Sequence, residues 1–424
     1  MKQEGSPAVF DGLPASAGSA AVPAMPLNSW HFLVICVAAV LVVRGLPVGL
    51  VRKAALAAVN LYFLFLFVWG LYPLAALLVL LLATYGLGEL KVRCGDRIPG
   101  GVWTLVIAAL WVLLFLVKDP NLASGVNPFS AHPLRLVGIS YLVFRSIHYI
   151  ADAECLEGRS LLTFVNYAIF FPTFLAGPIE RYERFQVFHD SGDPQAPMEP
   201  LPIFHRIANG LVKKYVLADN LLAWGSLSHP PADQLAPPML WLSVMSLLVL
   251  LYLDFSGYCD IVIGVAALMG FRLMENFNRP FLATSVQDFW TRWHISLTSI
   301  VRDYVFTPLS HFVVYHFSRR WQFPLACAVY FFAMMLIALW HNTTWGFFVF
   351  GLLHGAMLVG LQVFRRYGYP RLGRGPREFF DRSPLVAWGS RAMNYAFVSF
   401  TMLFWQYGPA ESVSILGRMV GWQP

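Results

Sequence analysis

The sequence predicts an all-α polytopic membrane protein with about ten crossings. Of its 424 residues, 58% are hydrophobic and only 12% are charged, against about 25% charged in soluble domains. The apolar residues are gathered in separate runs, each close to the roughly 20 residues that a transmembrane helix needs. These runs lack the two-residue alternation of a membrane β-barrel, so helices are the expected spanning elements.

The N-terminal stretch, residues 1–28, is expected to be a flexible tail. It is rich in Ala, Pro, Gly and Ser. It lacks the charged region followed directly by an apolar core that marks a signal peptide. Residues 29–424 are then a single membrane-embedded domain, whose first span covers about residues 30–51.

Further apolar segments follow along the chain. They lie near residues 54–70, 73–90, 101–117, 134–152, 161–178, 207–225, 239–255, 257–271, 322–340, 343–364 and 388–408. Two of them, 161–178 and 257–271, carry Gly or Pro breaks. Broken backbone is tolerated at membrane depth only where protein or a water-filled cavity covers it. We therefore expect one or both of these segments to be re-entrant.

The net charge of +7 is better explained by membrane topology than by nucleic acid, because the basic residues lie in short loops. Loops with a Lys/Arg excess face the cytoplasm, and membrane lipid is then the expected surrounding partner. The loops placed on the cytoplasmic side are 51–53, 91–97, 181–185 and 365–377. Residues 226–238 and 341–344 carry no Lys or Arg and should face outward.

The five cysteines are scattered, and none forms a Cys/His pair at metal-ligand spacing. We expect free thiols and no metal site. The chain also lacks a Gly-rich phosphate loop, a serine nucleophile elbow and the H-E-x-x-H zinc motif. Energy for any group transfer must then come from a pre-activated donor.

Residues 287–303 are too polar for a span and too aromatic for a solvated loop, which favours an interfacial amphipathic helix. On one continuous helix, Asp288 and Arg292 are spaced four apart, as are Trp290 and His294. Polar and aromatic groups then occupy neighbouring faces. We expect this helix to press His294 against the membrane body.

His354 lies in the middle of the segment 343–364, in the stretch "GLLHGAML". A polar side chain at the centre of a span is costly and faces the protein interior or a wet cavity. Imidazole titrates near neutral pH and suits a general base. Gly351 and Gly355 would leave room for a substrate. The alternative is a histidine hydrogen-bonded across the bundle for packing alone.

Five blocks carry a family resemblance. They read "GISYLVFRSIHYIAD" (138–152), "FFPTFLAGPIERYERF" (170–185), "YLDFSGYCDIVIG" (252–264), "ENFNRPFLATSVQDFWTRWHISLTSIVRDYVFTPL" (275–309) and "ALWHNTTWGFFVFGLLHG" (338–355). In order and spacing they resemble the membrane-bound O-acyltransferase family, over roughly residues 130–410. Its bacterial branch includes the membrane proteins of alginate O-acetylation, peptidoglycan O-acetylation and teichoic-acid D-alanylation.

The resemblance implies a ring of about 10–11 tilted helices, with re-entrant and interfacial amphipathic helices, around a thin centre that a thioester donor enters from the cytoplasm. It also implies two site histidines, which match His354 and His294. His354 would remove the proton of the acceptor hydroxyl as that oxygen attacks the thioester carbonyl. For His294 the alternative is an anchor for the amphipathic helix.

His341 lies in "LWHNTTW", where Asn342 stands in place of the family's usual glycine. On one continuous helix, His341 and His354 would be about 20 Å apart, too far to touch one reacting carbonyl unless the chain bends between them. We expect His341 at the outer mouth of the site, on the acceptor side.

Candidates for binding the donor or lining its channel are Asn276, Trp290, Arg292, Trp293 and Arg302. Asn276 would donate hydrogen bonds to the thioester or its pantetheine arm, and the arginines would meet phosphate.

Five carboxylates could form an acid pair or a proton relay, but we expect structural ion pairs because buried charges at membrane depth are usually paired. The carboxylates are Asp254, Asp260, Glu275, Asp288 and Asp303, and the arginines close to them in sequence are Arg272, Arg279, Arg292 and Arg302.

The expected function is O-acyl transfer in the bacterial cytoplasmic (inner) membrane, with no bound cofactor. Acyl-CoA or an acyl carrier protein would supply the acyl group, for which acetyl is favoured, from the cytoplasmic side. Hydroxyls of an exported glycan, or a periplasmic acyltransferase, would receive it. The first alternative is D-alanyl transfer to a teichoic-acid-like envelope polymer. The second is a transporter or channel, since carriers also have intramembrane histidines and broken helices, although the chain shows no internal repeat.

Overall fold

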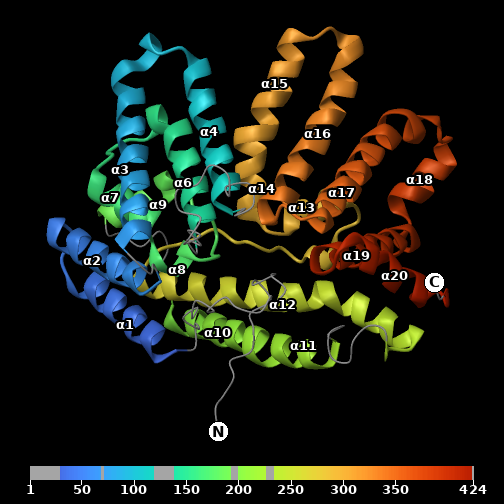
Figure 1. Cartoon of the computed structure of the whole chain (residues 1–424), viewed down its shortest axis with the longest axis horizontal. Helices are drawn as coiled ribbons and strands as arrows, with labels where there is room; N and C mark the ends of the chain where they lie inside the picture. Colours follow the sequence, from blue (N-terminus) through green and yellow to red (C-terminus); the bar gives the residue numbers. More distant parts are fainter. Residues whose placement is uncertain (1–28, 68–70, 119–137, 192–198, 226–233, 423–424) are drawn as a thin grey trace. The chain divides into compact units, whose positions relative to one another are not determined.

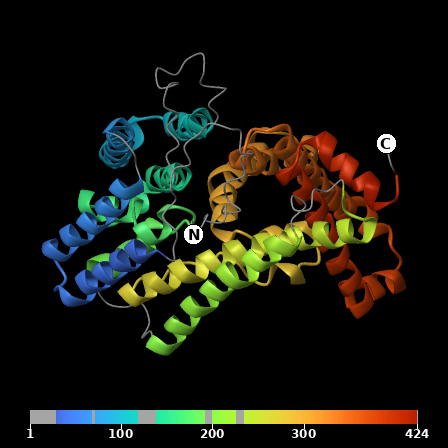
Figure 2. The same cartoon turned by 60° about the horizontal axis from the view of Figure 1, so that its bottom comes forward.

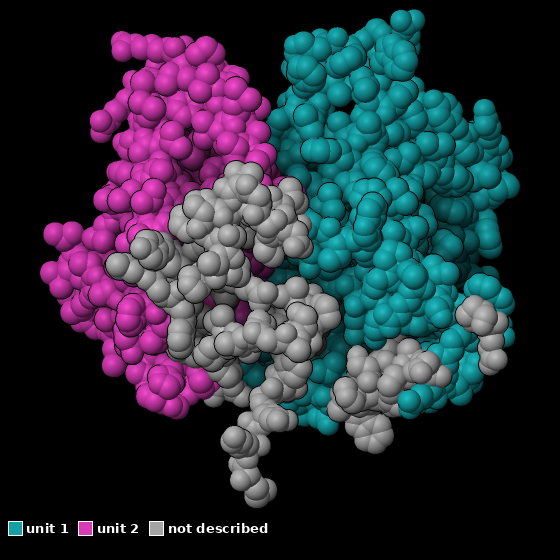
Figure 3. Space-filling model, in the orientation of Figure 1, with its two compact units in different colours: residues 1–13, 212–257, 276–424 teal, residues 14–211, 258–275 magenta. Residues whose placement is uncertain are grey.

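The computed structural model describes residues 29–67, 71–118, 138–191, 199–225 and 234–422 (Figure 1). The predicted flexible tail lies outside these ranges. Within them the fold is helical and contains no strand, and Phe277 and Trp293 form an isolated antiparallel bridge. The chain divides into two compact units (Figure 3). Of the described residues, unit 1 comprises 212–225, 234–257 and 276–422, and unit 2 comprises 29–67, 71–118, 138–191, 199–211 and 258–275.

Among the described helices, four are long and apolar enough to cross a membrane. They are Leu74–Arg97, Pro237–Met269, Arg319–His341 and Trp345–Arg371. Two shorter apolar helices, Trp30–Gly45 and Gly100–Leu116, accompany them. The predicted class, an all-α polytopic membrane protein, is confirmed.

Unit 2 is built around a buried helix. Its helices are α1 (Trp30–Gly45), α2 (Leu50–Phe67), α3 (Leu71–Cys94), α4 (Gly100–Lys118), α6 (Ile139–Ala151), α7 (Leu161–Ala168), α8 (Phe171–Phe174), α9 (Tyr182–Ser191) and α10 (Pro200–Leu211). Helix α6 packs against α3 and α4, and α2 packs against α1 and α7. Since α6 is covered on several sides, its side chains from Tyr141 to Ile150 are all buried, as expected for a helix surrounded by neighbours.

The segment 161–178 is broken, as predicted, between α7 and α8. Arg145 of α6 closes this break, because its guanidinium donates hydrogen bonds to the main-chain carbonyls of Tyr167 at 3.1 Å, Ala168 at 2.8 Å and Thr173 at 3.1 Å. The Arg145 side chain is 1% exposed. The carbonyls freed by the break are therefore satisfied inside the protein, which is what makes non-helical backbone tolerable in a membrane protein.

The predicted break in the segment 257–271 is wrong. Helix α12 runs without interruption over Pro237–Met269. Gly264 lies where α10 packs against the part of α12 that belongs to unit 2, and a Cβ there would collide with the side chain of Ile207. Arg206 of α10 also pairs with Asp260 at 3.1 Å. Figure 2 shows α12 as one long helix, drawn in yellow. The glycine serves close helix packing instead of a break.

Unit 1 consists of helical hairpins. Its elements are the π-helical turn η3 (Val212–Ala218), α11 (Asp219–Gly225), the first part of α12, α13 (Val286–Arg292), α14 (Ile295–Val301), the π-helical turn η6 (Arg302–Phe306), α15 (Thr307–His316), α16 (Arg319–His341), α17 (Trp345–Val363), α18 (Arg374–Arg382), α19 (Pro384–Gln406) and α20 (Pro409–Met419). Helix α16 packs against α15 and α17, and α17 also packs against α13 and α19 (Figure 1).

The contact between α16 and α17 depends on two glycines. A Cβ on Gly355 would lie 2.7 Å from the ring of Phe331, and one on Gly351 would lie 2.7 Å from the Cβ of Ala338. The expectation that Gly351 and Gly355 leave room for a substrate is therefore wrong. The space beside them is filled by side chains of α16.

Candidate active site

His354 is fully buried on α17, and both of its ring nitrogens are partnered. The indole N–H of Trp290 donates to Nδ1 at 3.2 Å, and Nε2 lies 2.9 Å from the Thr401 hydroxyl. That hydroxyl already donates to the carbonyl of Val398 at 2.8 Å. It must therefore accept from His354, so the network assigns the proton to Nε2 and the lone pair to Nδ1.

Aromatic side chains enclose the imidazole of His354. Ring centroids lie at 4.2 Å for Phe350, 5.0 Å for Phe397 and 5.6 Å for Trp290. Such a wall excludes water, and a hydrogen bond or a charge is worth more in a low-dielectric site than in water.

His294 lies at a break in the backbone. Its φ of 46° is left-handed, a conformation that costs free energy for a bulky residue and that persists only where surrounding contacts impose it. Two main-chain hydrogen bonds do so, from Asn278 N to Arg292 O at 2.9 Å and from Ile295 N to Asn276 O at 3.0 Å. The predicted continuous helix over 287–303 is therefore wrong, because α13 ends and α14 begins on either side of this residue.

The His294 side chain is oriented by Asn276. The Oδ1 atom of Asn276 lies 3.3 Å from His294 Nδ1, and it also accepts from the amide and the hydroxyl of Ser296. An amide oxygen only accepts, so Nδ1 carries the proton. Nε2 then keeps a lone pair, which has no hydrogen-bond partner in the described part of the chain. Burial lowers the pKa of His294 to about 3, so the ring is neutral at neutral pH.

A continuous row of aromatic contacts in unit 1 connects the three predicted histidines. The ring-centroid distances along the row are 6.2 Å for His294–Trp340, 4.3 Å for Trp340–His341, 4.2 Å for His341–Trp405, 5.5 Å for Trp405–Phe350 and 4.2 Å for Phe350–His354. The separation of about 20 Å assumed a continuous helix. That premise is wrong, since α16 ends at His341 and α17 begins at Trp345.

The family model for the membrane-bound O-acyltransferases matches residues 101–373, which include all three histidines. The chain belongs to the membrane-bound O-acyltransferase family. The predicted resemblance is thereby confirmed.

Curated relatives fall in the three groups that the sequence blocks resemble. The probable alginate O-acetylase of Pseudomonas fluorescens is 32% identical over 74% of this chain and 60% of its own length. The peptidoglycan O-acetyltransferase of Helicobacter pylori is 31% identical over 62% of this chain and 48% of its own length. The teichoic acid D-alanyltransferase of Bacillus subtilis is 29% identical over 58% of this chain and 66% of its own length. The chain thus spans about half to two thirds of the length of these relatives.

The other predicted site residues differ in how far they contact the histidines. Trp290 binds His354 directly, whereas Trp293 stacks on Phe289 with centroids 5.3 Å apart. The Asn276 carbonyl oxygen accepts from His294 and Ser296 and so orients His294. That its amide N–H groups donate to a thioester stays a prediction, because these contacts do not involve them.

The two candidate arginines are held by neighbouring carboxylates. Arg292 pairs with Asp288 at 2.7 Å, and Arg302 pairs with Asp303 at 2.8 Å. Nothing in these contacts tests whether either arginine meets a donor phosphate. Their side chains are 32% and 65% exposed, which leaves N–H donors of both open to a ligand.

The expectation of structural ion pairs is confirmed for all five carboxylates, but several partners were not foreseen. Asp260 and Glu275 both pair with Arg206, and Asp254 pairs with Lys214. These two basic residues lie 40 or more positions away in sequence, so proximity along the chain does not identify them.

The residue that the sequence did not single out is Thr401. Its only signal is a hydroxyl inside the apolar run "FVSFTMLFW" of α19. Thr401 and Phe397 also lie beyond the matched family region. Among the described residues, no group of three or more His, Cys, Asp or Glu side chains is arranged to hold a metal ion.

Proposed function

We propose that this chain transfers an acyl group from a thioester to a hydroxyl group within the membrane. The observation that carries the proposal is the buried His354, whose proton is held on Nε2 by Thr401, so that Nδ1 is the nitrogen able to accept a proton. Membership of the O-acyltransferase family over residues 101–373 supports the same reaction. It also favours acyl transfer over the transporter that an intramembrane histidine would suggest.

In the proposed reaction, the hydroxyl oxygen of the acceptor attacks the carbonyl carbon of the thioester while Nδ1 of His354 takes the hydroxyl proton. A C–O bond forms, the C–S bond breaks, and the proton passes from the imidazolium to the departing thiolate. The products are an ester and a free thiol. The acceptor hydroxyl displaces the indole N–H of Trp290, which occupies Nδ1 in the absence of substrate.

His294 is proposed to position a substrate beside this base. With its proton on Nδ1 and directed at Asn276, the imidazole offers an acceptor at Nε2. An amide N–H of a pantetheine arm or the hydroxyl of the acceptor are groups that can donate to it. His341, which lies between the two in the aromatic row, is proposed to meet the acceptor.

We propose acetyl as the acyl group, with acetyl-CoA or an acyl carrier protein as the cytoplasmic donor. The acceptor is a hydroxyl of an exported glycan, reached directly or through a periplasmic acyltransferase, and the location is the bacterial inner membrane. The alginate and peptidoglycan relatives support acetyl, because their names state acetylation. The teichoic acid relative supports D-alanyl transfer as the alternative.

The test combines transfer by the purified protein with the chemistry of the glycan. The protein in lipid nanodiscs is incubated with labelled acetyl-CoA, acetylated carrier protein or D-alanylated carrier protein, and mass spectrometry compares envelope glycans from cells with and without the chain. Loss of acetyl esters supports the proposal, and loss of D-alanyl esters supports the alternative. If folded protein consumes no thioester and the glycans are unchanged, the proposed function is wrong.

A further inference from the structure

A second polar cluster lies in unit 2, and none of its groups enters the proposed reaction. It borders a small pocket, which we call the Arg52 pocket. Two cationic side chains, Arg52 and Lys53 from the first turn of α2, line the pocket together with apolar side chains from α1, α2, α9 and the chain after α12. The apolar residues are Val43, Leu56, Phe188 and Phe271.

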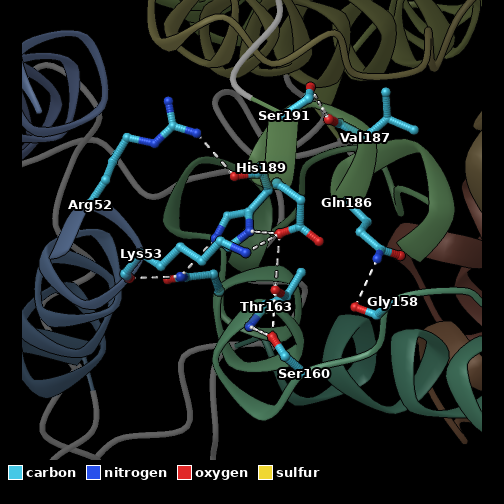
Figure 4. Close-up of polar contacts among 11 residues, drawn as sticks. Arg52, Lys53, Gly158, Ser160, Thr163, Gln186, Val187, His189 and Ser191 are labelled. Carbon is cyan, nitrogen blue, oxygen red and sulfur yellow. Dashed lines mark hydrogen bonds and ion pairs between the residues drawn. The ribbon is translucent and has the colours of Figure 1, made fainter. Parts of the chain in front are cut away.

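Arg52 is a buried cation that has few partners for its N–H donors. It is 6% exposed, and within the described residues its guanidinium makes one hydrogen bond, from a terminal nitrogen to the carbonyl of His189 at 3.0 Å. No carboxylate in the described chain lies within ion-pair distance of Arg52. A guanidinium has five N–H donors, so most of them have no acceptor. Figure 4 shows the other terminal nitrogen directed away from His189.

The one nearby acid is already engaged. Asp190 pairs with Lys53, accepts from the Thr163 hydroxyl at 3.2 Å, and lies 2.9 Å from Nδ1 of His189. Asp190 also attracts the charge of Arg52, but it forms its ion pair with Lys53. A largely buried cation without an ion-pair partner is costly, and an anion at the pocket would lower that cost.

The cluster is rigidly held before any ligand arrives. Asn166 of α7 donates through Nδ2 to the Lys53 carbonyl at 2.9 Å and lies 3.0 Å from Nε2 of His189, while its Oδ1 accepts from Asn60 at 3.1 Å. These bonds join the start of α2 to α7 and α9. A site preorganised in this way loses less entropy when it binds a ligand.

The pocket offers a guanidinium whose N–H donors are mostly unused, which suits an anionic headgroup. Two further arginines, Arg44 and Arg272, directly follow the lining residues Val43 and Phe271 and are exposed. Basic pockets between transmembrane helices on the cytoplasmic side bind anionic lipid headgroups, and residues 51–53 are expected on that side from the Lys/Arg bias.

We propose that Arg52 binds the headgroup phosphate of an anionic phospholipid at this pocket. Arginine suits this role because its planar fork can donate two parallel hydrogen bonds to phosphate. None of the residues that line the Arg52 pocket belongs to the group of His294, His341 and His354. The proposal therefore does not depend on whether the chain transfers an acyl group.

The test compares lipids and variants of the full chain. Delipidated protein is titrated with phosphatidylglycerol, phosphatidylcholine or inorganic phosphate, and the melting temperature and the lipid retained in native mass spectrometry are followed. The parent should prefer phosphatidylglycerol to phosphatidylcholine at least about tenfold, because the choline cation offsets the phosphate charge and repels Arg52. Arg52→Gln should lose that preference. The control Arg93→Gln, which removes an exposed charge of unit 2, should keep it.

A second variant keeps the test decisive if Arg52→Gln does not fold. Val43→Phe leaves every charge in place but puts a larger side chain into the pocket that Val43 lines, and it should reduce retention of phosphatidylglycerol. The proposal fails if the parent shows no preference between the two lipids, or if folded Arg52→Gln is as selective as Arg93→Gln. Stabilisation by inorganic phosphate equal to that by phosphatidylglycerol would also overturn it, in favour of a site for free anions.

Discussion

The two candidate histidines differ in which ring nitrogen carries the lone pair. His354 presents Nδ1, covered by the indole of Trp290, whereas His294 presents Nε2, which has no partner among the described residues. In each case a second residue fixes the tautomer, Thr401 for His354 and Asn276 for His294. The sequence predicts both histidines but neither of these roles, because a tautomer is decided by a hydrogen-bond partner that is distant in the chain.

Replacing His354 by Ala should lower turnover by about 10²- to 10⁴-fold, which is the usual contribution of a positioned base. The measurement is thioester consumption in nanodiscs by protein with a parent-like melting temperature. His316→Ala removes an exposed histidine of α15 and serves as the control, with activity expected to match the parent. Transfer by folded His354→Ala within threefold of the parent would show that His354 is not the base.

Thr401 is expected to act through His354 by fixing its tautomer. Thr401→Val removes the acceptor for the Nε2 proton at nearly the same volume, and a buried donor without a partner costs about 1–3 kcal/mol. We predict a decrease in kcat of about tenfold or more with little change in KM for the donor. Thr401→Ser keeps the hydroxyl and should restore the rate. If the two variants have the same kcat, Thr401 has only a packing role.

Two breaks show which features of helices can be predicted from sequence. The break between α7 and α8 lies at the start of the stretch "FFPTFLAGPIE", which contains Pro and Gly. Its signal in the sequence is therefore local. The break at His294 has no such signal. It exists because residues 276–278 pair with the backbone at Arg292 and Ile295, and this contact between separate segments overrides the helical pattern of 287–303.

The packing of α16 on α17 can be tested at Gly355. In Gly355→Ala the new Cβ would lie 2.7 Å from the Phe331 ring, and overpacking of this kind typically costs about 1–3 kcal/mol. The melting temperature should fall. Gly360→Ala on the same helix is the matched control, because nothing lies within 4 Å of its Cβ position.

A second substitution identifies the cause. Phe331→Ala opens the space that the new methyl group needs, so the double variant Gly355→Ala/Phe331→Ala should lose less stability than the sum of the two single changes. Strict additivity would mean that the Phe331 ring is not what excludes a side chain at Gly355. An equal loss in Gly360→Ala would point to a general effect of alanine in this helix.

For the molecule as a whole, composition predicts the class of fold, while the internal partners require the structure. High apolar content and segment length are enough for an all-α polytopic membrane protein. The charges are different. Arg52 and Lys91 were predicted to lie in basic loops that face the cytoplasm, yet they belong to α2 and α3 and both side chains are buried. Lys91 donates to the carbonyl of Ile150 at 3.2 Å. The bias in Lys and Arg predicts the side of the membrane, but not what each charge contacts inside a unit.

The polar cluster of unit 2 should make stability depend on pH. Burial lowers the pKa of His189, and this outweighs the opposing hydrogen bond to Asp190. Burial opposes ionisation of Asp190, but hydrogen bonds from His189 and Lys53 outweigh it and hold the pKa of that carboxyl below its ordinary value. Each group thus binds protons less readily in the folded than in the unfolded state, so its stabilising contribution is lost as pH falls. The loss begins below about pH 6.5 for His189 and only below about pH 3.9 for Asp190.

Between pH 7.5 and pH 5.5, of these two groups only His189 should therefore contribute. The free energy of unfolding should decrease by at most about 1.4 kcal/mol per pH unit below pH 6.5 from this residue. His189→Gln cannot take up the proton, so its melting temperature should fall less than that of the parent when both are moved from pH 7.5 to pH 5.5 in one detergent. His205→Gln removes an exposed histidine of α10 in the same unit and should retain the parent's pH dependence. If His189→Gln follows the parent across this range, the cluster does not couple folding to protonation at His189.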